Sequence, residues 1–367
     1  MIKSDIFFTG YYGQLNTGDD AFVEVAAWGA NKFWNKKNLR FSAVSQRLPK
    51  VQASIKGYSF SIPKTYNFQQ SLLLNNTDYL ISAGGSTFQN EIRQGSLKAK
   101  AMGLQEKNKL KIGAIGVSIG PFKSKAEEND NIEYLKRMSF LTVRDKRSYD
   151  YAKTLGLPYE PVEAFDLAAL LPEIYGIPDG TFQDKKVIGV SLCNYERYVK
   201  GDVVNETRRN KEITALLKQL DKKMENIIFK FFVINGSPQR GDLPLTQETI
   251  QDVAFKNEVK IELYNSNTMS VWNNIAACDF VLTTRLHAGI FACFADTPFM
   301  MVEYHKKCTD FLDDVGQPNS YRINDAYFDH DYVLQSIGNI LEKEQEIPIH
   351  KDMVIRKAEL NFKNVIL

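Results

Sequence analysis

Short apolar runs alternate with longer amphipathic stretches along most of this chain, and that alternation limits the fold more than any other feature. In the first half, the expected strands are residues 5–9, 79–82, 111–117 and 140–143. Helical patterns at 19–34 and 145–155, and a polar helix after residue 85, separate these runs. Strands that alternate with helices indicate parallel sheets with crossover helices.

The pattern stops at a proline- and glycine-rich segment, 172–186, and then restarts. Such a composition is typical of a linker between domains. Strands are expected beyond it at 187–192, 227–233, 259–263, 280–283 and 299–302, and helices at 207–224, 269–277, 286–295 and within 331–367. The sequence therefore predicts an α/β protein with two Rossmann-like domains, 1–172 and 184–345, and a helical tail, 346–367. In such sheets, ligands bind beyond the carboxyl ends of the strands.

Charge and cysteine usage exclude several classes of protein. The 46 basic and 44 acidic residues give a net charge of +2, which provides no electrostatic case for a nucleic-acid partner. The four cysteines form no CxxC pair and no zinc-like cluster, so we expect reduced thiols and no metal. Without a long uncharged apolar run, and with a strand near the start, we expect a cytoplasmic protein with at most peripheral membrane association.

Glycine-rich loops follow several of the expected strands in the first half. The loop 10–20 has three glycines, and Asn16 and Asp19 lie where the next helix begins, with Asp19 placed to cap it. Gly84 and Gly85 follow the strand 79–82, and a third glycine-rich loop lies at 116–121. Backbone amides in such loops suit a phosphate or a sugar, and a structural turn or a bend demanded by sheet packing is the alternative for each loop. The spacing matches neither GxGxxG nor Walker A, which disfavours a dinucleotide.

Four polar residues follow strands and are candidates for anion binding. Arg144 comes after the strand 140–143, and Arg285 and His287 come after 280–283, at a helix start that favours an anion. His287 can also exchange protons near neutral pH. Lys306 follows the strand 299–302. A structural salt bridge is the alternative for Arg144, and a solvated helix start is the alternative for Lys306.

Taken in order, these segments resemble the polysaccharide pyruvyl transferase family. The matching pieces are 10–13, 16–19, 82–85, 116–121, 143–145 with Ser148, Asp166 before 170–171, 285–288, 297–298 and 304–306 with Phe311. The resemblance implies a GT-B-like fold and phosphoenolpyruvate as donor, with the N-terminal domain as the acceptor side. The family's donor-binding arginines are matched by Arg144 and Arg285, and its general acid by His287. Leu286 and Lys306 complete the expected donor set.

One part of the family pattern is different in this chain. Where family members often have a third glycine and then an acidic residue, this chain has Ser86 and then Glu91. The acceptor set is therefore Asn16, Asp19, Gly84, Gly85 and Glu91, with Glu91 as the candidate for activating the acceptor.

The resulting prediction is an enzyme that transfers a pyruvyl group from phosphoenolpyruvate, a co-substrate, to hydroxyls of a polysaccharide or a lipid-linked oligosaccharide, forming a ketal. No other cofactor is expected. Two alternatives fit the same residues: a glycosyltransferase that uses a nucleotide sugar, and a non-catalytic carbohydrate- or nucleotide-binding protein. Fold alone does not separate them.

Overall fold

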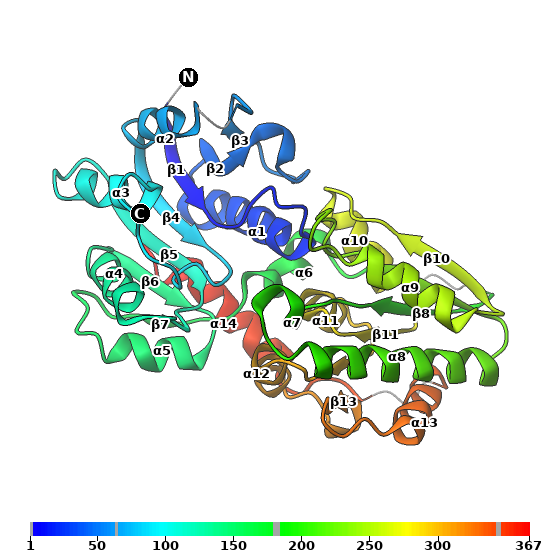
Figure 1. The fold of residues 1–367 in the computed structure, drawn as a ribbon. Helices are drawn as coiled ribbons and strands as arrows, with labels where there is room; N and C mark the ends of the chain where they lie inside the picture. Colours follow the sequence, from blue (N-terminus) through cyan, green and yellow to red (C-terminus); the bar gives the residue numbers. More distant parts are fainter. Residues whose placement is uncertain (1–2, 63–64, 179–183, 343–345) are drawn as a thin grey trace.

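A computed structural model describes residues 3–62, 65–178, 184–342 and 346–367. Two parallel sheets lie side by side, each covered by helices on its faces (Figure 1). Part of the segment expected to be a linker, residues 179–183, lies outside the described residues, and so do residues 343–345 of the expected C-terminal domain. None of the described helices is long and apolar enough to cross a bilayer.

The first sheet has the strand order β3-β2-β1-β4-β5-β6-β7, with all pairs parallel. Its strands are β1 (Ser4–Thr9), β2 (Leu39–Val44), β3 (Ile55–Tyr58), β4 (Thr77–Ala83), β5 (Lys111–Val117), β6 (Phe140–Val143) and β7 (Val162–Glu163). Its helices are α1 (Thr17–Trp34), α2 (Tyr66–Leu74), α3 (Leu97–Gln105), α4 (Lys125–Lys136) and α5 (Lys146–Lys153). A short turn, η3 (Leu167–Leu170), and α6 (Leu171–Tyr175) lead towards the second sheet.

The second sheet has the order β10-β9-β8-β11-β12-β13 and is also parallel. Its strands are β8 (Lys186–Ser191), β9 (Ile227–Phe232), β10 (Glu258–Glu262), β11 (Phe280–Thr283), β12 (Phe299–Val302) and β13 (Arg322–Ile323). Its helices are α7 (Glu196–Val199), α8 (Val203–Lys223), α9 (Leu243–Val253), α10 (Thr268–Ala276), α11 (Leu286–Phe294), α12 (Lys306–Val315) and α13 (His330–Leu341). The order places β11, whose carboxyl end is followed by Arg285 and His287, in the middle of the sheet.

The last helix, α14 (Lys351–Lys363), returns to the first sheet instead of ending the second domain (Figure 1). It packs against β5, β6 and β7. Buried Asn361 donates from its amide to the carbonyl of Phe165 at 2.9 Å, and the Trp34 indole donates to the carbonyl of Phe362 at 3.1 Å. The final segment of the chain therefore ties the two lobes together.

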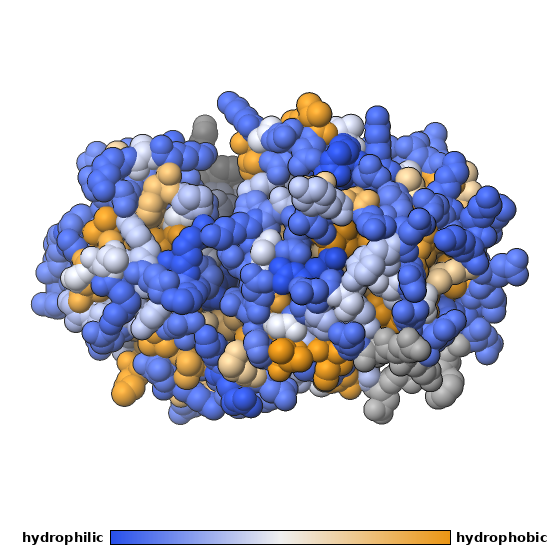
Figure 2. All heavy atoms as spheres, turned by 90° about the horizontal axis from the view of Figure 1, so that it is seen from below, coloured by the Kyte–Doolittle hydropathy of each residue, from blue (hydrophilic) through white to orange (hydrophobic). Residues whose placement is uncertain are grey.

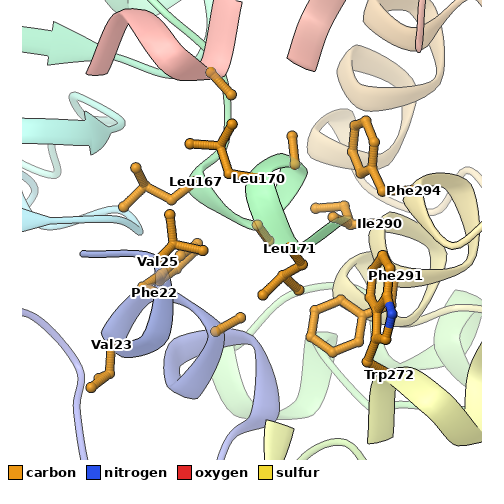
Figure 3. Close-up of a cluster of buried hydrophobic side chains, with 14 of the residues drawn as sticks. Phe22, Val23, Val25, Leu167, Leu170, Leu171, Trp272, Ile290, Phe291 and Phe294 are labelled. Atoms are coloured by element: carbon orange, nitrogen blue, oxygen red, sulfur yellow. The ribbon is translucent and has the colours of Figure 1, made fainter. Parts of the chain in front are cut away.

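A single hydrophobic cluster runs through the contact between the lobes. Figure 3 shows Phe22 and Val25 from α1 and Leu170 from η3 facing Phe291 and Trp272 of the second lobe. Because this apolar contact is continuous, separating the lobes would expose much of the core to water. The face seen from below in Figure 2 is covered mainly by hydrophilic side chains.

Candidate active site

The carboxyl ends of β6 and β11 bring two arginines to the contact between the lobes. Arg144 follows β6 directly, and its guanidinium donates to Ser118 at 2.8 Å and to Asp166 at 2.6 Å. Side-chain exposure is only 10% for Arg144 and 7% for Asp166. The salt bridge that was the structural alternative for Arg144 therefore exists. The salt bridge uses Nη1, whereas Nε donates to Ser118, and among the described residues Nη2 of Arg144 donates no hydrogen bond.

Arg285 is held in a similar way by a carboxylate of its own lobe. The Thr283 hydroxyl accepts from the backbone amide of Arg285 at 2.8 Å, which fixes the turn into α11. Nε and Nη2 of Arg285 donate to fully buried Asp242, with Nε at 2.9 Å from one oxygen. Burial alone would lower the pKa of Arg285, but the Asp242 carboxylate outweighs it and raises that pKa above its ordinary value. Arg285 is therefore a permanent cation.

His287 lies one residue into α11 and faces the N-terminal lobe. Its ring meets the ring of Phe22 edge-on, with centroids 5.3 Å apart. A methyl group on Gly18 would come within 2.2 Å of its Nδ1, so only glycine allows this approach. Nε2 is buried and has no hydrogen-bond partner among the described residues. Burial, followed by the charges of Arg144 and Arg285, lowers the pKa of His287 to about 4, against the attraction of Asp166. The ring is therefore neutral at neutral pH.

Asp19 completes this arrangement from the first turn of α1. It does not cap the helix as predicted: the N-cap is Asn16, whose side chain accepts from the Gly18 amide at 3.1 Å. Burial, and then the neighbouring charge of Asp20, raise the pKa of Asp19 to about 7, while Arg144 and Arg285 act in the opposite direction. Asp19 therefore titrates near neutrality. We call Asp19, Arg144, Asp166, Arg285 and His287 the arginine cluster.

Backbone hydrogen bonds between the lobes hold the loop 10–20, which we call the glycine loop, against the second sheet. The amide of Thr17 donates to the carbonyl of Ile234 at 3.0 Å, and that of Gly236 donates to Leu15 at 2.8 Å. Gly84 has a φ of +72°, and a side chain there would come within 2.3 Å of the Phe22 ring. Gly85 also has a positive φ, +74°. Gly84 therefore lets Phe22 pack between β4 and His287.

Two residues predicted for the site lie elsewhere. Lys306 is exposed, whereas its neighbour Lys307 reaches across to the first lobe and donates to the Ser86 hydroxyl at 2.9 Å. Burial lowers the pKa of Lys307 to about 8. Glu91 is 61% exposed and lies 4.0 Å from Arg93, with no contact to the arginine cluster. The structure thus brings together Asn16, Asp19, Gly84, Arg144, Arg285 and His287 and leaves out Lys306 and Glu91.

A pocket opens beside the arginine cluster and encloses about 450 Å³, part of it open to solvent. Both lobes line this cleft pocket, through Ser118, Arg144, Asp166, Leu286, Lys307 and Asp310. Leu286, predicted for the donor set, forms part of its apolar wall. Its walls combine apolar surface with charges of both signs, three cations (Arg144, Arg147 and Lys307) and four carboxylates (Asp145, Asp166, Asp310 and Asp314).

A second hollow lies at the carboxyl ends of β1 and β2, entirely in the first lobe. It encloses about 770 Å³, part of it open solvent, and we call it the tyrosine groove. Its lining includes Tyr12, Gln14, Arg47, Tyr58, Tyr66 and Gln70. Tyr58 and Tyr66 stack with centroids 5.6 Å apart, and Gln70 donates to the Tyr58 hydroxyl at 3.3 Å. The glycine loop connects the groove to the arginine cluster, because Tyr12 lines the groove and lies within electrostatic range of Asp19.

Three site residues were missed from the sequence. Asp166 was noticed only as part of the family pattern, although η3 begins directly after it. Lys307 is the neighbour of a residue that was predicted. Asp242 gave no signal, because it lies in a loop and only packing pairs it with Arg285. Within the described ranges, no group of three His, Cys, Asp or Glu side chains is arranged to hold a metal ion.

Comparison with solved structures places the fold among two-domain enzymes of the GT-B-like type. A putative UDP-N-acetylglucosamine 2-epimerase from Listeria monocytogenes matches with a TM-score of 0.61 at 9% identity, covering 98% of this chain and 93% of that one. The UDP-GlcNAc 2-epimerase from Neisseria meningitidis, bound to UDP-GlcNAc, matches with a TM-score of 0.57 at 10% identity, covering 99% and 96%. At such identities the likeness establishes the fold alone. The predicted architecture of two Rossmann-like domains is confirmed.

The family follows from sequence. The model of the polysaccharide pyruvyl transferase family matches residues 16–306, which is most of the chain. This protein therefore belongs to the polysaccharide pyruvyl transferase family, as the resemblance predicted. Among individual curated proteins, none matches it in sequence.

Proposed function

We propose that this transferase moves the pyruvyl group of phosphoenolpyruvate to two hydroxyls of a glycan, forming a ketal and releasing inorganic phosphate. The observation that carries the proposal is the convergence of Arg144 and Arg285, one from each sheet, on Asp19 and His287. Each guanidinium has an Nη without a hydrogen bond to any described residue: Nη2 in Arg144 and Nη1 in Arg285. The carboxylate and the phosphate of phosphoenolpyruvate, which are attached to the same carbon, match two such cations.

In this proposal, the cleft pocket takes the donor. Guanidinium groups suit carboxylate and phosphate because their donors are planar and paired. Asp166 and Asp242 hold the two arginines in position before the donor arrives, and such preorganisation reduces the entropy lost on binding. Lys307, which lines the same pocket, supplies a third cation from the second lobe.

His287 is the proposed general acid. Ketal formation requires a proton on the methylene carbon, which leaves positive character on the carbon that bears the phosphate oxygen. One sugar hydroxyl adds to that carbon, phosphate departs, and a second hydroxyl closes the ring. His287 is neutral without donor, so the negative charge of the bound donor must raise its pKa before it can transfer a proton.

Asp19 is the proposed base for the acceptor, in place of Glu91, whose exposed side chain lies away from the arginine cluster. With a pKa of about 7, Asp19 can take up a hydroxyl proton near neutral pH. The acceptor sugar would lie in the tyrosine groove, where the partly exposed ring of Tyr66, backed by buried Tyr58, suits the apolar face of a sugar. Tyr12, which joins the groove to Asp19, would then direct the hydroxyl towards the donor.

Incubation with phosphoenolpyruvate and candidate glycans tests the proposal, with mass spectrometry for a pyruvyl adduct and an assay for inorganic phosphate. We expect both products, also in the presence of a chelator. Arg285→Lys should weaken donor binding in calorimetry because it removes the guanidinium fork, whereas Arg93→Lys, an exposed control, should not. Unchanged donor affinity in Arg285→Lys would contradict the assignment.

A nucleotide sugar is the rival donor, since a neighbour in fold binds UDP-GlcNAc. A thermal-shift comparison separates the two. Stabilisation by UDP-GlcNAc and none by phosphoenolpyruvate would favour a glycosyltransferase over a pyruvyl transferase.

A further inference from the structure

Four large apolar side chains are exposed together at the outer end of the first lobe. Their exposed fractions are 60% for Phe60, 58% for Ile62, 70% for Phe68 and 38% for Leu72. Phe60 and Ile62 follow the edge strand β3, and Phe68 and Leu72 are four residues apart on one face of α2. We call these four residues the apolar patch. A contiguous exposed patch of this kind marks an interaction surface.

The apolar patch is held in place rather than loosely attached. Buried Gln69 accepts from the Phe60 amide at 3.1 Å and donates to the Phe60 carbonyl at 3.1 Å. The Tyr66 hydroxyl donates to the carbonyl of Ser61 at 3.2 Å. These bonds fasten the segment after β3 to α2, so that both apolar pairs belong to one surface.

The stretch of sequence that contains the apolar patch is basic. Between Glu24 and Asp78 the sequence has no acidic residue. The same interval holds eight basic residues: Lys32, Lys36, Lys37, Arg40, Arg47, Lys50, Lys56 and Lys64. Because the whole chain carries only +2, the remaining sequence is net acidic, and positive charge is concentrated here.

Two of these eight basic residues are exposed close to the apolar patch. Lys56 lies on β3, and Arg47 lines the tyrosine groove beside Tyr66. Both are exposed, and neither forms an ion pair with a described residue. Lys100 of α3 donates to the carbonyl of Asn67 on α2 at 3.0 Å, and neither of these two helices has an acidic residue.

We propose that this face docks on an anionic lipid bilayer, with the apolar patch inserted at the interface and the surrounding lysines and arginines against the headgroups. Apolar side chains within a basic surface are the signature of interfacial binding, because burial and electrostatic attraction add. A protein partner of matching acidic character is the less favoured occupant, since two exposed phenylalanines and two aliphatic side chains suit an acyl-chain boundary.

The position of the patch has a consequence for the acceptor, which rests on the proposed function. Tyr58 and Tyr66 line the tyrosine groove, and Tyr58 belongs to β3 and Tyr66 to α2, the elements that bear the apolar patch. A protein docked in this way holds the mouth of the groove near the bilayer surface. The acceptor would then be a glycan carried on a lipid.

Co-sedimentation with vesicles tests the docking without donor or acceptor. We expect binding to vesicles of equal parts phosphatidylcholine and phosphatidylglycerol, weakened by salt, and little binding to pure phosphatidylcholine. Phe60→Ser and Phe68→Ser should each lower the partition coefficient about tenfold. Lys56→Glu should lower it by about fivefold or more.

Matched controls lie on the other lobe. Val204→Ser removes an apolar side chain that is 82% exposed, and Lys218→Glu reverses an exposed charge on α8. Neither should change vesicle binding. Equal binding to both vesicle types, or no effect of the patch variants, would overturn the proposal. The proposal would also be overturned if the wild-type protein were a dimer and Phe68→Ser were a monomer that does not bind vesicles, because the apolar patch would then be the contact between two copies.

Failure of docking and failure of the proposed function give different results. If vesicles are not bound while pyruvyl transfer to a water-soluble glycan persists in both wild type and Phe68→Ser, only the docking is refuted. If vesicles are bound but no pyruvyl adduct forms with any glycan, the docking stands and the proposed function is refuted.

Discussion

Asp19→Asn should stabilise the protein, and should do so increasingly as the pH rises. The pKa of Asp19 is raised to about 7 in the folded protein, mainly by burial, whereas its ordinary value is 3.8. Between these two values the folded state binds more protons than the unfolded state. Stability is therefore lost as the pH rises from the lower value through the upper one. Asparagine cannot ionise, so the variant escapes this loss.

The magnitude follows from the difference between the two pKa values. Each unit corresponds to about 1.4 kcal/mol, so the gain in unfolding free energy approaches about 4 kcal/mol above pH 8, as an upper estimate. Near pH 4 the same relation gives less than about 1 kcal/mol, because that pH is close to the ordinary pKa of 3.8 and the unfolded state has lost only part of its proton. Urea unfolding of both proteins at acidic, neutral and basic pH measures the trend.

Exposed Asp252 on α9 provides the control. Asp252→Asn should stay within about 0.5 kcal/mol of wild type at every pH. A destabilised Asp19→Asn, or a gain that does not grow with pH, would refute the reasoning, since it would mean that the arginines hold the carboxylate ionised. Loss of pyruvyl transfer in a stabilised variant would show that the charge at this position serves function and not folding.

Three further variants examine the same site. His287→Ala should lower turnover by about 10² to 10⁴-fold, and near-normal turnover would contradict its role as general acid. The same variant should lose less stability in acid than wild type, because the folded-state pKa of about 4 is below the ordinary value of 6.5 and the unfolded state therefore takes up the proton first. Gly18→Ala should displace the His287 ring, lower turnover and cost about 1 to 3 kcal/mol through overpacking, and an unchanged rate would contradict the contact, which is 2.2 Å for the added carbon. Asp242→Asn should cost about 3 kcal/mol in urea unfolding because it leaves Arg285, whose side chain is only 20% exposed, without its counter-ion; a neutral result would mean that water solvates the guanidinium.

The sequence located the central strands well. The expected runs 111–117, 140–143, 280–283 and 299–302 coincide with β5, β6, β11 and β12. These strands are buried on both faces, so their apolar residues are nearly continuous and easily recognised. By contrast, β2 and β3 were missed, because polar residues such as Ser42 and Lys56 interrupt their apolar runs.

Features that depend on tertiary packing could not be predicted. The helical pattern of α14 was recognised, but periodicity does not say against which sheet a helix packs. The ion pair of Arg285 with Asp242 joins residues that are distant in sequence, and no local pattern marks either as a partner. At the start of α12, Lys307 faces the first lobe and the preceding Lys306 does not. Sequence-based predictions of helix boundaries are not precise to one residue, so they could not tell these two lysines apart.

In the proposed function, the charges of the arginine cluster connect donor binding to proton supply. Without donor, His287 is neutral, first because it is buried and then because two guanidinium groups and Lys307 lie near it. Asp166 and Asp242 offset the arginines, but each engages only part of its guanidinium. A donor with a phosphate and a carboxylate would make the local charge more negative. Its two anionic groups would act together with the Asp166 carboxylate, which already raises the pKa of His287, and would favour the protonated ring. His287 would then become protonated only when a donor is bound. Without a donor the ring stays neutral, so the buried site does not have to stabilise a charged histidine.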